Sequence, residues 1–288
     1  MTAAETCRVP KIVSTTSLFK AGSVAIGGGS PLALLAGPCV IESEEHVQFL
    51  STELSKLGAP LIFKASFDKA NRSSVTSYRG PGLKEGIRIL KRVRARGIPV
   101  VTDIHTPDQA GPVAEAADIL QIPAFLCRQT DLLVEAGRTG RIVNIKKGQF
   151  VSPHDIRHAA KKVASTGNSQ IMLTERGSSF GYNNLVVDMR GLAIMRSFGW
   201  PVVFDATHSV QLPGASGAAS GGQPQFIDPL ASAAVAVGID ALFVEVHEAP
   251  ERALSDGANA LRLDRLPALW RKLNRIQTAA TAGESSQA

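Results

Sequence analysis

Short apolar runs recur along the chain, and each is followed by a polar-patterned segment long enough for one helix. We expect strands at residues 32–36, 61–65, 98–102, 119–122, 142–145, 171–174, 202–205 and 241–246. We expect helices at residues 44–57, 82–96, 108–116, 130–137, 153–165, 184–198, 229–237 and 266–277. Continuous apolar strands that alternate with helices are typical of a parallel sheet covered on both faces, and eight such units favour a closed (β/α)8 barrel, the TIM barrel. An open doubly wound α/β sheet is the alternative.

The two ends of the chain differ from this repeating pattern. Residues 1–30 predict two short strands, 11–19 and 23–26, on either side of Ala21-Gly22, so we expect a β-hairpin that closes the barrel floor. Residues 31–277 form the predicted catalytic barrel domain, and the small, polar residues 278–288 predict a disordered tail. Residues 212–226 are rich in Gly, Ala and Ser, which suits either a mobile lid or a surface loop without a function.

Composition narrows the class of protein. With 44% hydrophobic and 19% charged residues, a 288-residue chain can bury the core of one barrel domain. No run approaches the roughly 18 to 20 apolar residues that span a bilayer, so we expect a cytoplasmic protein without a membrane partner. Cys7, Cys39 and Cys127 cannot all pair, which disfavours a disulfide framework.

The formal charge of +6 leaves nucleic acid or small anions as candidate ligands. The one basic run, residues 84–96, has the spacing of an amphipathic helix with Ile87, Leu90 and Val93 inward, which favours a solvated helix face. Aromatic residues make up only 5% of the chain and give no stacking platform, so no nucleic-acid partner is expected.

Polar residues cluster at the carboxyl ends of the predicted strands or just beyond them. These residues are Cys39, Lys64, Lys69, Asp103, His105, Gln121, Lys146, Arg176, His208 and Glu245. Any one of them could be an exposed ion-pair partner, but in a (β/α)8 barrel this end carries the active site, so the set predicts one pocket. Five cations, Lys64, Lys69, Arg72, Lys146 and Arg176, would repel one another there unless a multiply anionic ligand lay among them. A substrate with phosphate and carboxylate groups meets that need.

A metal site is a second possibility at the same end. Cys39, His208, Glu245 and Asp256 offer a thiolate, an imidazole and two carboxylates, which zinc, iron or another divalent transition metal accepts. The first three follow neighbouring strands of a closed barrel. A buried structural cysteine and a hydrogen-bonded histidine remain the alternative.

Six blocks of the chain resemble the synthases that join phosphoenolpyruvate to aldose phosphates, and five of them resemble the octulosonate-phosphate branch in particular. The blocks are residues 36–43, 64–74, 121–131, 144–150, 174–184 and 205–211. The resemblance runs from about residue 32 to about residue 263. It implies condensation of phosphoenolpyruvate with D-arabinose 5-phosphate and water to an octulosonate phosphate and inorganic phosphate, a step toward the Kdo of lipopolysaccharide.

The acceptor sugar is indicated by the residues after the second strand. The sister branch, the 3-deoxy-D-arabino-heptulosonate-7-phosphate synthases, uses erythrose 4-phosphate and typically carries Lys-Pro-Arg-Thr-Ser there, whereas this chain has Lys-Ala-Asn-Arg-Ser at residues 69–73. That sister activity and a non-catalytic sugar-phosphate-binding barrel remain the two alternatives. Better turnover with erythrose 4-phosphate would favour the first, and tight binding without turnover the second.

The resemblance also implies roles for individual residues. Phosphoenolpyruvate contacts are implied for Lys64, Ser66, Lys69, Gln121, Lys146 and Arg176, and arabinose 5-phosphate contacts for Asn71, Arg72, Ser73 and Arg128. Catalytic roles are implied for Lys69, Asp103, His105, His208 and Glu245. Cys39, His208, Glu245 and Asp256 occupy the four positions of the metal-dependent members, whose ion could be Zn, Fe, Mn or Co. Arg128 is implied to reach the active site of a neighbouring subunit in a homotetramer.

Overall fold

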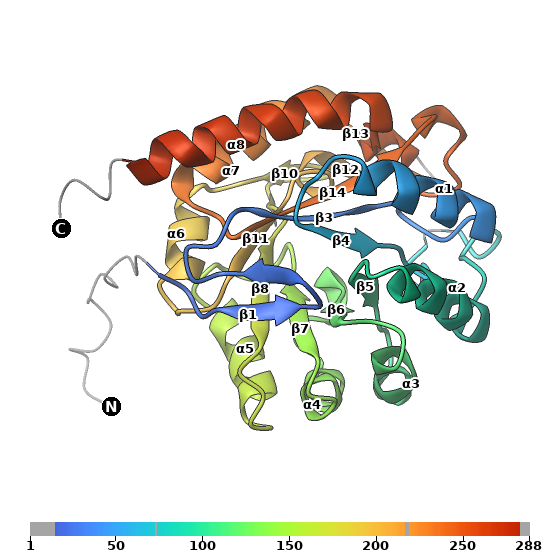
Figure 1. Cartoon of the computed structure of the whole chain (residues 1–288), viewed down its shortest axis with the longest axis horizontal. Coiled ribbons are helices and arrows are strands. Elements are labelled where there is room, and N and C mark those ends of the chain that lie inside the picture. The colour runs from blue at the N-terminus through green and yellow to red at the C-terminus, as the bar shows by residue number, and fades with distance from the viewer. Residues whose placement is uncertain (1–14, 73, 217–218, 283–288) are drawn as a thin grey trace.

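Eight parallel strands form a closed barrel in the computed structural model, which describes residues 15–72, 74–216 and 219–282 (Figure 1). They are β3 (Ala33–Gly37), β4 (Leu61–Lys64), β5 (Val100–Asp103), β6 (Ile119–Ile122), β7 (Ile142–Lys146), β8 (Ile171–Glu175), β11 (Val202–Asp205) and β14 (Ala241–His247). Strand β14 pairs in parallel with both β11 and β3 and so closes the ring. The predicted (β/α)8 barrel is confirmed, and the open sheet is excluded.

Successive side chains on each strand pack into two different hydrophobic cores. In β3, Leu34 and Ala36 pack with the surrounding helices, whereas Ala33 and Leu35 point into the barrel. This alternation follows from the two-residue period of a strand, and burial on both faces explains why the runs are apolar throughout.

In the described part of the chain, eight α-helices surround the strands: α1 (Glu44–Ser55), α2 (Leu83–Ala95), α3 (Ala110–Ala114), α4 (Thr130–Arg138), α5 (Ile156–Ala164), α6 (Arg190–Arg196), α7 (Ile227–Val237) and α8 (Leu266–Ala282). Helix α1 begins where the Ser43 side chain accepts a hydrogen bond from the backbone N–H of His46. Over the described residues, no helix is long and apolar enough to cross a membrane.

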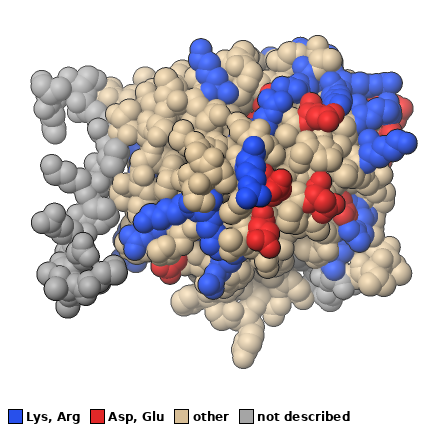
Figure 2. Space-filling model, turned by 90° about the horizontal axis from the view of Figure 1, so that it is seen from below, with Lys and Arg blue, Asp and Glu red and all other residues tan. Residues whose placement is uncertain are grey.

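The basic run lies on α2 as the sequence predicts. Leu90 and Val93 are buried together with Ile89, whereas Ile87 is only partly buried. On the outer face, Arg88 and Arg92 both pair with Glu44. On the side of the molecule in Figure 2, basic and acidic side chains are likewise interspersed.

An amino-terminal hairpin packs beside the amino-terminal ends of the barrel strands. Strands β1 (Phe19–Ala21) and β2 (Val24–Ile26) pair in antiparallel fashion around Gly22, whose φ of +53° suits a residue without a side chain. The buried side chains of the hairpin share one core cluster with Ala33 and Met172 of the barrel interior. The predicted first strand, 11–19, is displaced: only Phe19 belongs to β1, and residues 11–14 lie outside the described part of the chain.

Three predicted segments differ from the structure. Residues 184–198 contain a short strand, β10 (Leu185–Val186), paired with β9 (Ser178–Ser179), and the helix begins only at Arg190, where the Asp188 carboxylate accepts the Arg190 N–H. The Gly- and Ala-rich segment is a hairpin of β12 (Gln211–Ser216) and β13 (Ala219–Gly222), followed by a 3-10 turn (Pro224–Phe226).

Helix α8 continues to Ala282, so the disorder predicted for residues 278–282 is wrong. The good helix-forming propensity of alanine explains this extension.

Candidate active site

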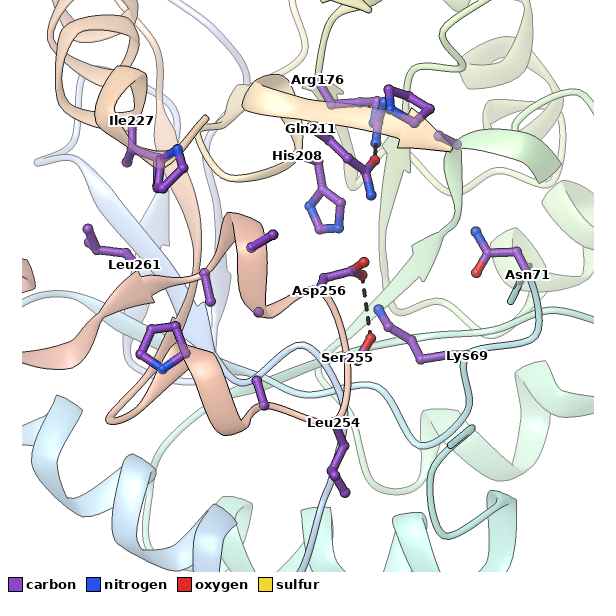
Figure 3. Close-up of a pocket in the computed structure, with 18 of the residues that line it drawn as sticks. Lys69, Asn71, Arg176, His208, Gln211, Ile227, Leu254, Ser255, Asp256 and Leu261 are labelled. Carbon is purple, nitrogen blue, oxygen red and sulfur yellow. Dashed lines mark hydrogen bonds between the residues drawn. The ribbon is translucent and has the colours of Figure 1, made fainter. Parts of the chain in front are cut away.

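A cavity of about 1620 Å³ opens at the carboxyl ends of the barrel strands. Its lining includes most of the polar residues that the sequence singled out: Lys69, Asn71, Arg72, Asp103, His105, Lys146, Arg176, His208 and Asp256. Figure 3 shows Lys69, Asn71, Arg176, His208 and Asp256 around one opening, although they come from four separate strand-to-helix connections. The predicted convergence on one pocket is therefore present.

Lys64 and Glu245 form a buried ion pair beneath this cavity. The Lys64 ammonium donates to Glu245 Oε1 at 2.5 Å and to the Cys39 carbonyl at 2.7 Å, and both side chains are 1% exposed. The Lys69 ammonium lies 3.9 Å from the same carboxylate oxygen. Burial opposes ionisation of Glu245, but the cations Lys64 and Lys69 outweigh it and hold its pKa below the usual range. The pKa of Lys69 is raised in turn by neighbouring acidic groups, despite its burial.

A line of side-chain hydrogen bonds crosses the barrel at the same level. Asp103 accepts from Ser66 Oγ and, at 2.6 Å, from Gln121 Nε2. The Gln121 oxygen accepts from Asn144 Nδ2 at 2.9 Å, and the Asn144 oxygen accepts from Thr174 at 2.6 Å. This line fixes which end of each amide is donor and which is acceptor, so Gln121 and Ser66 are held in place before any substrate arrives.

Asp103 and His105, at the end of β5, differ in their protonation. Burial raises the pKa of Asp103, but Lys69, Lys64 and Lys146 together lower it below the usual range. Burial lowers the pKa of His105, and its Nδ1 is buried without a hydrogen-bond partner among the described residues. An ionised carboxylate thus lies beside a neutral imidazole, a pair suited to proton transfer.

Lys146 and Arg176 provide the opposite wall of the cavity. The Lys146 ammonium donates to Asp205 at 2.7 Å and lies 3.8 Å from the centre of the Phe243 ring. Arg176 is 4% exposed and donates from Nη2 to Gln211 at 3.0 Å, as Figure 3 shows. Its Nη1 is buried and has no hydrogen-bond partner within the described residues. A buried guanidinium with an unused donor is stable only if a ligand or water completes its hydrogen bonds, and an anion does this best.

Cys39, Glu245 and Asp256 lie together as a candidate metal site, which we call the metal-ligand group. One ligand atom from each lies within 4.8 Å of the others, and the Cys39 thiol donates to Asp256 Oδ2 at 3.1 Å. His208 Nε2 lies 3.7 Å from Glu245 Oε2, and its Nδ1 lies 2.8 Å from Asp205. The four predicted ligands are therefore brought together, with His208 at the edge of the group.

These residues fit a divalent transition ion. Burial, followed by the charges of Asp256 and Glu245, raises the pKa of the Cys39 thiol well above its usual value. Glu245 Oε2 is buried without a hydrogen-bond partner in the described chain. Two carboxylates and a thiol at this spacing can hold a divalent ion, which would convert the thiol to the thiolate that binds it.

The predicted acceptor-sugar residues are divided among different locations. Arg72 lines the cavity and donates to the Tyr78 and Leu254 carbonyls at 3.1 and 2.8 Å. Ser73 lies outside the described residues. Arg128 is exposed, and it does not line the cavity of its own chain.

Three residues that the sequence did not single out contribute to the site. Asp205 contacts both Lys146 and His208, Gln211 orients Arg176, and Ser255 Oγ lies 2.9 Å from the Cys39 sulfur. Asp205 carried a usable signal, because it ends an apolar strand as Asp103 does.

Fold and site together define a (β/α)8-barrel enzyme with a cationic pocket beside residues that could hold a metal ion. A model of the DAHP synthetase I family matches residues 11–281, so the chain belongs to this family. A protein of Geobacter metallireducens is 61% identical over 260 residues, which cover 88% of this chain and 96% of the relative. One of Trichlorobacter lovleyi is 59% identical over 266 residues, which cover 91% and 98% of the two chains. Both relatives are named 2-dehydro-3-deoxyphosphooctonate aldolase.

Proposed function

We propose that this protein is a 3-deoxy-D-manno-octulosonate-8-phosphate synthase. The names of its relatives denote the same enzyme. C3 of phosphoenolpyruvate attacks the aldehyde carbon of arabinose 5-phosphate, and a carbon–carbon bond forms. Water adds at C2, and the bond from C2 to the phosphate oxygen breaks, which releases inorganic phosphate. The observation that carries the proposal is the unused Arg176 donor in a cationic cavity of a chain about 60% identical to such enzymes.

Phosphoenolpyruvate is bound at the cationic wall. Lys146 and Arg176 contact its phosphate, while Lys64 and Lys69 lie near its carboxylate. Ser66 and Gln121, already fixed by Asp103, orient the enol ester. Cations and donors that are in place before the reaction stabilise developing oxyanions without reorganising.

Proton transfer is carried out by side chains in or just after strands other than those of Lys146 and Arg176. Asp103 is ionised and His105 neutral, so each can accept a proton from the attacking water and, once protonated, pass it to the aldehyde oxygen. Lys69 and His208 line the same cavity, Glu245 lies beneath it, and these three residues complete the catalytic set. Asn71, Arg72 and Ser73 bind the acceptor sugar.

We further propose that Cys39, His208, Glu245 and Asp256 hold a divalent ion, Zn, Fe, Mn or Co. Such an ion supplies Lewis-acid polarisation and fixes substrate and side chains in place. If its role is positional, Cys39→Asn retains part of the activity without metal, whereas Cys39→Ala loses both metal and turnover. Metal content and phosphate release of the two variants test this, and equal inactivity of both contradicts a positional role.

Subunit assembly and location complete the proposal. Arg128 is exposed, Phe125 three residues before it is 54% exposed, and Phe150, 60% exposed, follows the next strand. An exposed group of this kind suits a homotetramer in which Arg128 reaches the sugar phosphate of a neighbouring subunit. We assign the enzyme to the cytoplasm, where phosphoenolpyruvate is available.

The deciding experiment measures phosphate release from phosphoenolpyruvate with arabinose 5-phosphate and, separately, with erythrose 4-phosphate. Each reaction is run before chelation, after chelation and with metal restored. Turnover with the pentose that is lost on chelation supports both acceptor and metal. Preference for erythrose 4-phosphate assigns the chain to the heptulosonate branch, and tight binding without turnover favours a sugar-phosphate sensor.

A further inference from the structure

A second group of ionisable side chains lies behind the metal-ligand group. We call Glu42, His46, His247 and Glu248 the histidine–glutamate cluster. Glu42, His46 and Glu248 line a small surface cavity of about 510 Å³ together with Leu254, and His247 lies beside Glu42 and Glu248. His247 is 5% exposed, and its Nε2 is buried without a hydrogen-bond partner within the described residues. Nothing in the proposed reaction uses these side chains.

The ring nitrogens of His247 are not arranged to bind a metal ion. Its Nδ1 accepts the backbone N–H of Ala249 at 2.9 Å, so this nitrogen holds a lone pair and the proton of the neutral ring is on Nε2. Nε2 faces Glu42 Oε1 at 3.5 Å. A protonated nitrogen cannot ligate a metal, which disfavours a second metal site although Glu42, His46 and His247 are ligand-type residues. Nε2 lies near the Glu42 carboxylate without a hydrogen bond to it among the described residues, so the contact that fixes Glu42 is the one to the Leu254 backbone.

Glu42 in turn holds the segment that carries Asp256. Its Oε1 accepts the backbone N–H of Leu254 at 2.8 Å, and the Leu254 carbonyl accepts from Arg72 Nη2 at 2.8 Å. The Leu254 backbone is thus fixed on both sides, while its side chain points away from Asp256 and Lys69 (Figure 3). Two residues later, Asp256 adopts the left-handed conformation with φ of +49°, which an ordinary side chain avoids unless its surroundings impose it.

The positions of these contacts connect all three segments of the metal-ligand group. Glu42 follows Cys39 by three residues, His247 follows Glu245 by two, and Leu254 precedes Asp256 by two. We infer that Glu42 is a positioning residue for the metal site, one that sets the spacing of the Cys39 and Asp256 ligands through its bond to the Leu254 N–H. The inference rests on the proposed metal dependence. Groups that orient metal ligands are typically worth about 10- to 100-fold in metal affinity.

The test titrates Co²⁺ into the metal-free full-length protein and follows the absorption of the cobalt–thiolate bond to Cys39. Glu42→Ala removes the acceptor, and we expect about 10- to 100-fold weaker binding. Glu42→Gln keeps an oxygen for the Leu254 N–H and should restore nearly the affinity of the unmodified protein. Glu45→Ala is the matched control, because it removes an exposed carboxylate that lines the same small cavity.

A variant at the other end of the bond keeps the test decisive if Glu42→Ala does not fold. Leu254→Pro removes the donor, and the preceding Ala253 already has the extended backbone, φ −60° and ψ 134°, that a following proline requires. It should weaken cobalt binding to a similar degree. Equal affinity of Glu42→Ala and the unmodified protein, or equal losses in Glu42→Gln and Glu42→Ala, overturns the inference. Absence of the cobalt–thiolate band from the unmodified protein overturns the metal assignment itself.

Discussion

The two ends of the barrel are made by the same eight strands, yet they contain opposite kinds of side chain. At the amino-terminal end, Ala33, Ile142 and Met172 pack with Ile26 of the hairpin in an apolar cluster. At the carboxyl end, Lys64, Asp103, Lys146 and Glu245 are all buried, each with a partner of opposite charge or a hydrogen bond.

Because of this difference, side chains at the amino-terminal end of each strand contribute mainly to stability, and side chains at the carboxyl end contribute mainly to the reaction. Apolar burial stabilises the fold at one end, while at the other end buried charges cost desolvation energy that their mutual attraction only partly returns. Such a site gains from an anionic ligand, because the ligand completes the contacts of groups such as Arg176. The comparison predicts that substitutions at the two ends affect different measurements.

The largest effect is expected on catalysis, from Arg176→Ala at the carboxyl end. Loss of a fixed donor to a developing oxyanion costs roughly 2.7–4 kcal/mol, or about 10²–10³ in kcat. Steady-state phosphate release measures this, with the melting temperature recorded alongside. A variant that lost stability but kept its turnover would reverse the proposed division between the two ends.

The next effect is expected on stability, from Ile26→Ala in the hairpin. Ile26 is fully buried in the amino-terminal cluster, and such truncations cost roughly 2–5 kcal/mol. Denaturant unfolding should show the loss, while turnover well below the melting temperature stays near that of the unmodified protein. Val24→Ala, in the same hairpin, should follow the same pattern with a smaller loss, because it removes less buried volume.

A smaller, pH-dependent effect is expected from Asp103→Asn. The folded protein holds the pKa of Asp103 below its usual range, so the unfolded chain binds the proton more readily. The stability that this carboxylate contributes is present above the unfolded pKa of about 4 and is lost as the pH falls toward the lower, folded pKa. The difference in unfolding free energy between the two proteins, about 1–3 kcal/mol at pH 7, should therefore shrink below about pH 4. A difference that grew on acidification would contradict the lowered pKa.

The smallest effect is expected from Arg92→Ala on the outer face of α2. Its ion pair with Glu44 is exposed to solvent, and Arg88 pairs with the same carboxylate. Exposed pairs contribute little because water and salt screen them. Melting temperature and turnover should both match those of the unmodified protein within experimental error.

Sequence predicted the parts of the fold in which one side-chain pattern repeats. Strands β6 and β11 have the predicted bounds, since burial on both faces makes all their positions apolar except Gln121 and Asp205, which belong to the site. The hairpin of β12 and β13 was missed because glycine, alanine and serine give no alternation of apolar and polar positions. Strand β10 was missed because the later residues of the same segment do form a helix, and the whole segment was predicted as one helix.

The sequence predicted those site residues whose location follows from their position along a strand. Lys64, Asp103 and Lys146 each end a strand, so barrel geometry alone places them at one mouth. The contact between Glu42 and Leu254 joins residues 212 positions apart in the chain, and no local pattern indicates it. Arg128 does not line the cavity of its own chain, so the role that the resemblance implies for it stays a prediction.

The closing pair of strands has a consequence for how the protein is made. Glu245 on β14 lies in register with Gly37 on β3, two residues before Cys39, so the metal-ligand group spans the seam between the first and last barrel strands. During synthesis Cys39 emerges more than two hundred residues before Asp256. The proposed ion would therefore be loaded only after nearly the whole chain has left the ribosome, and once bound it would oppose separation of the two strands.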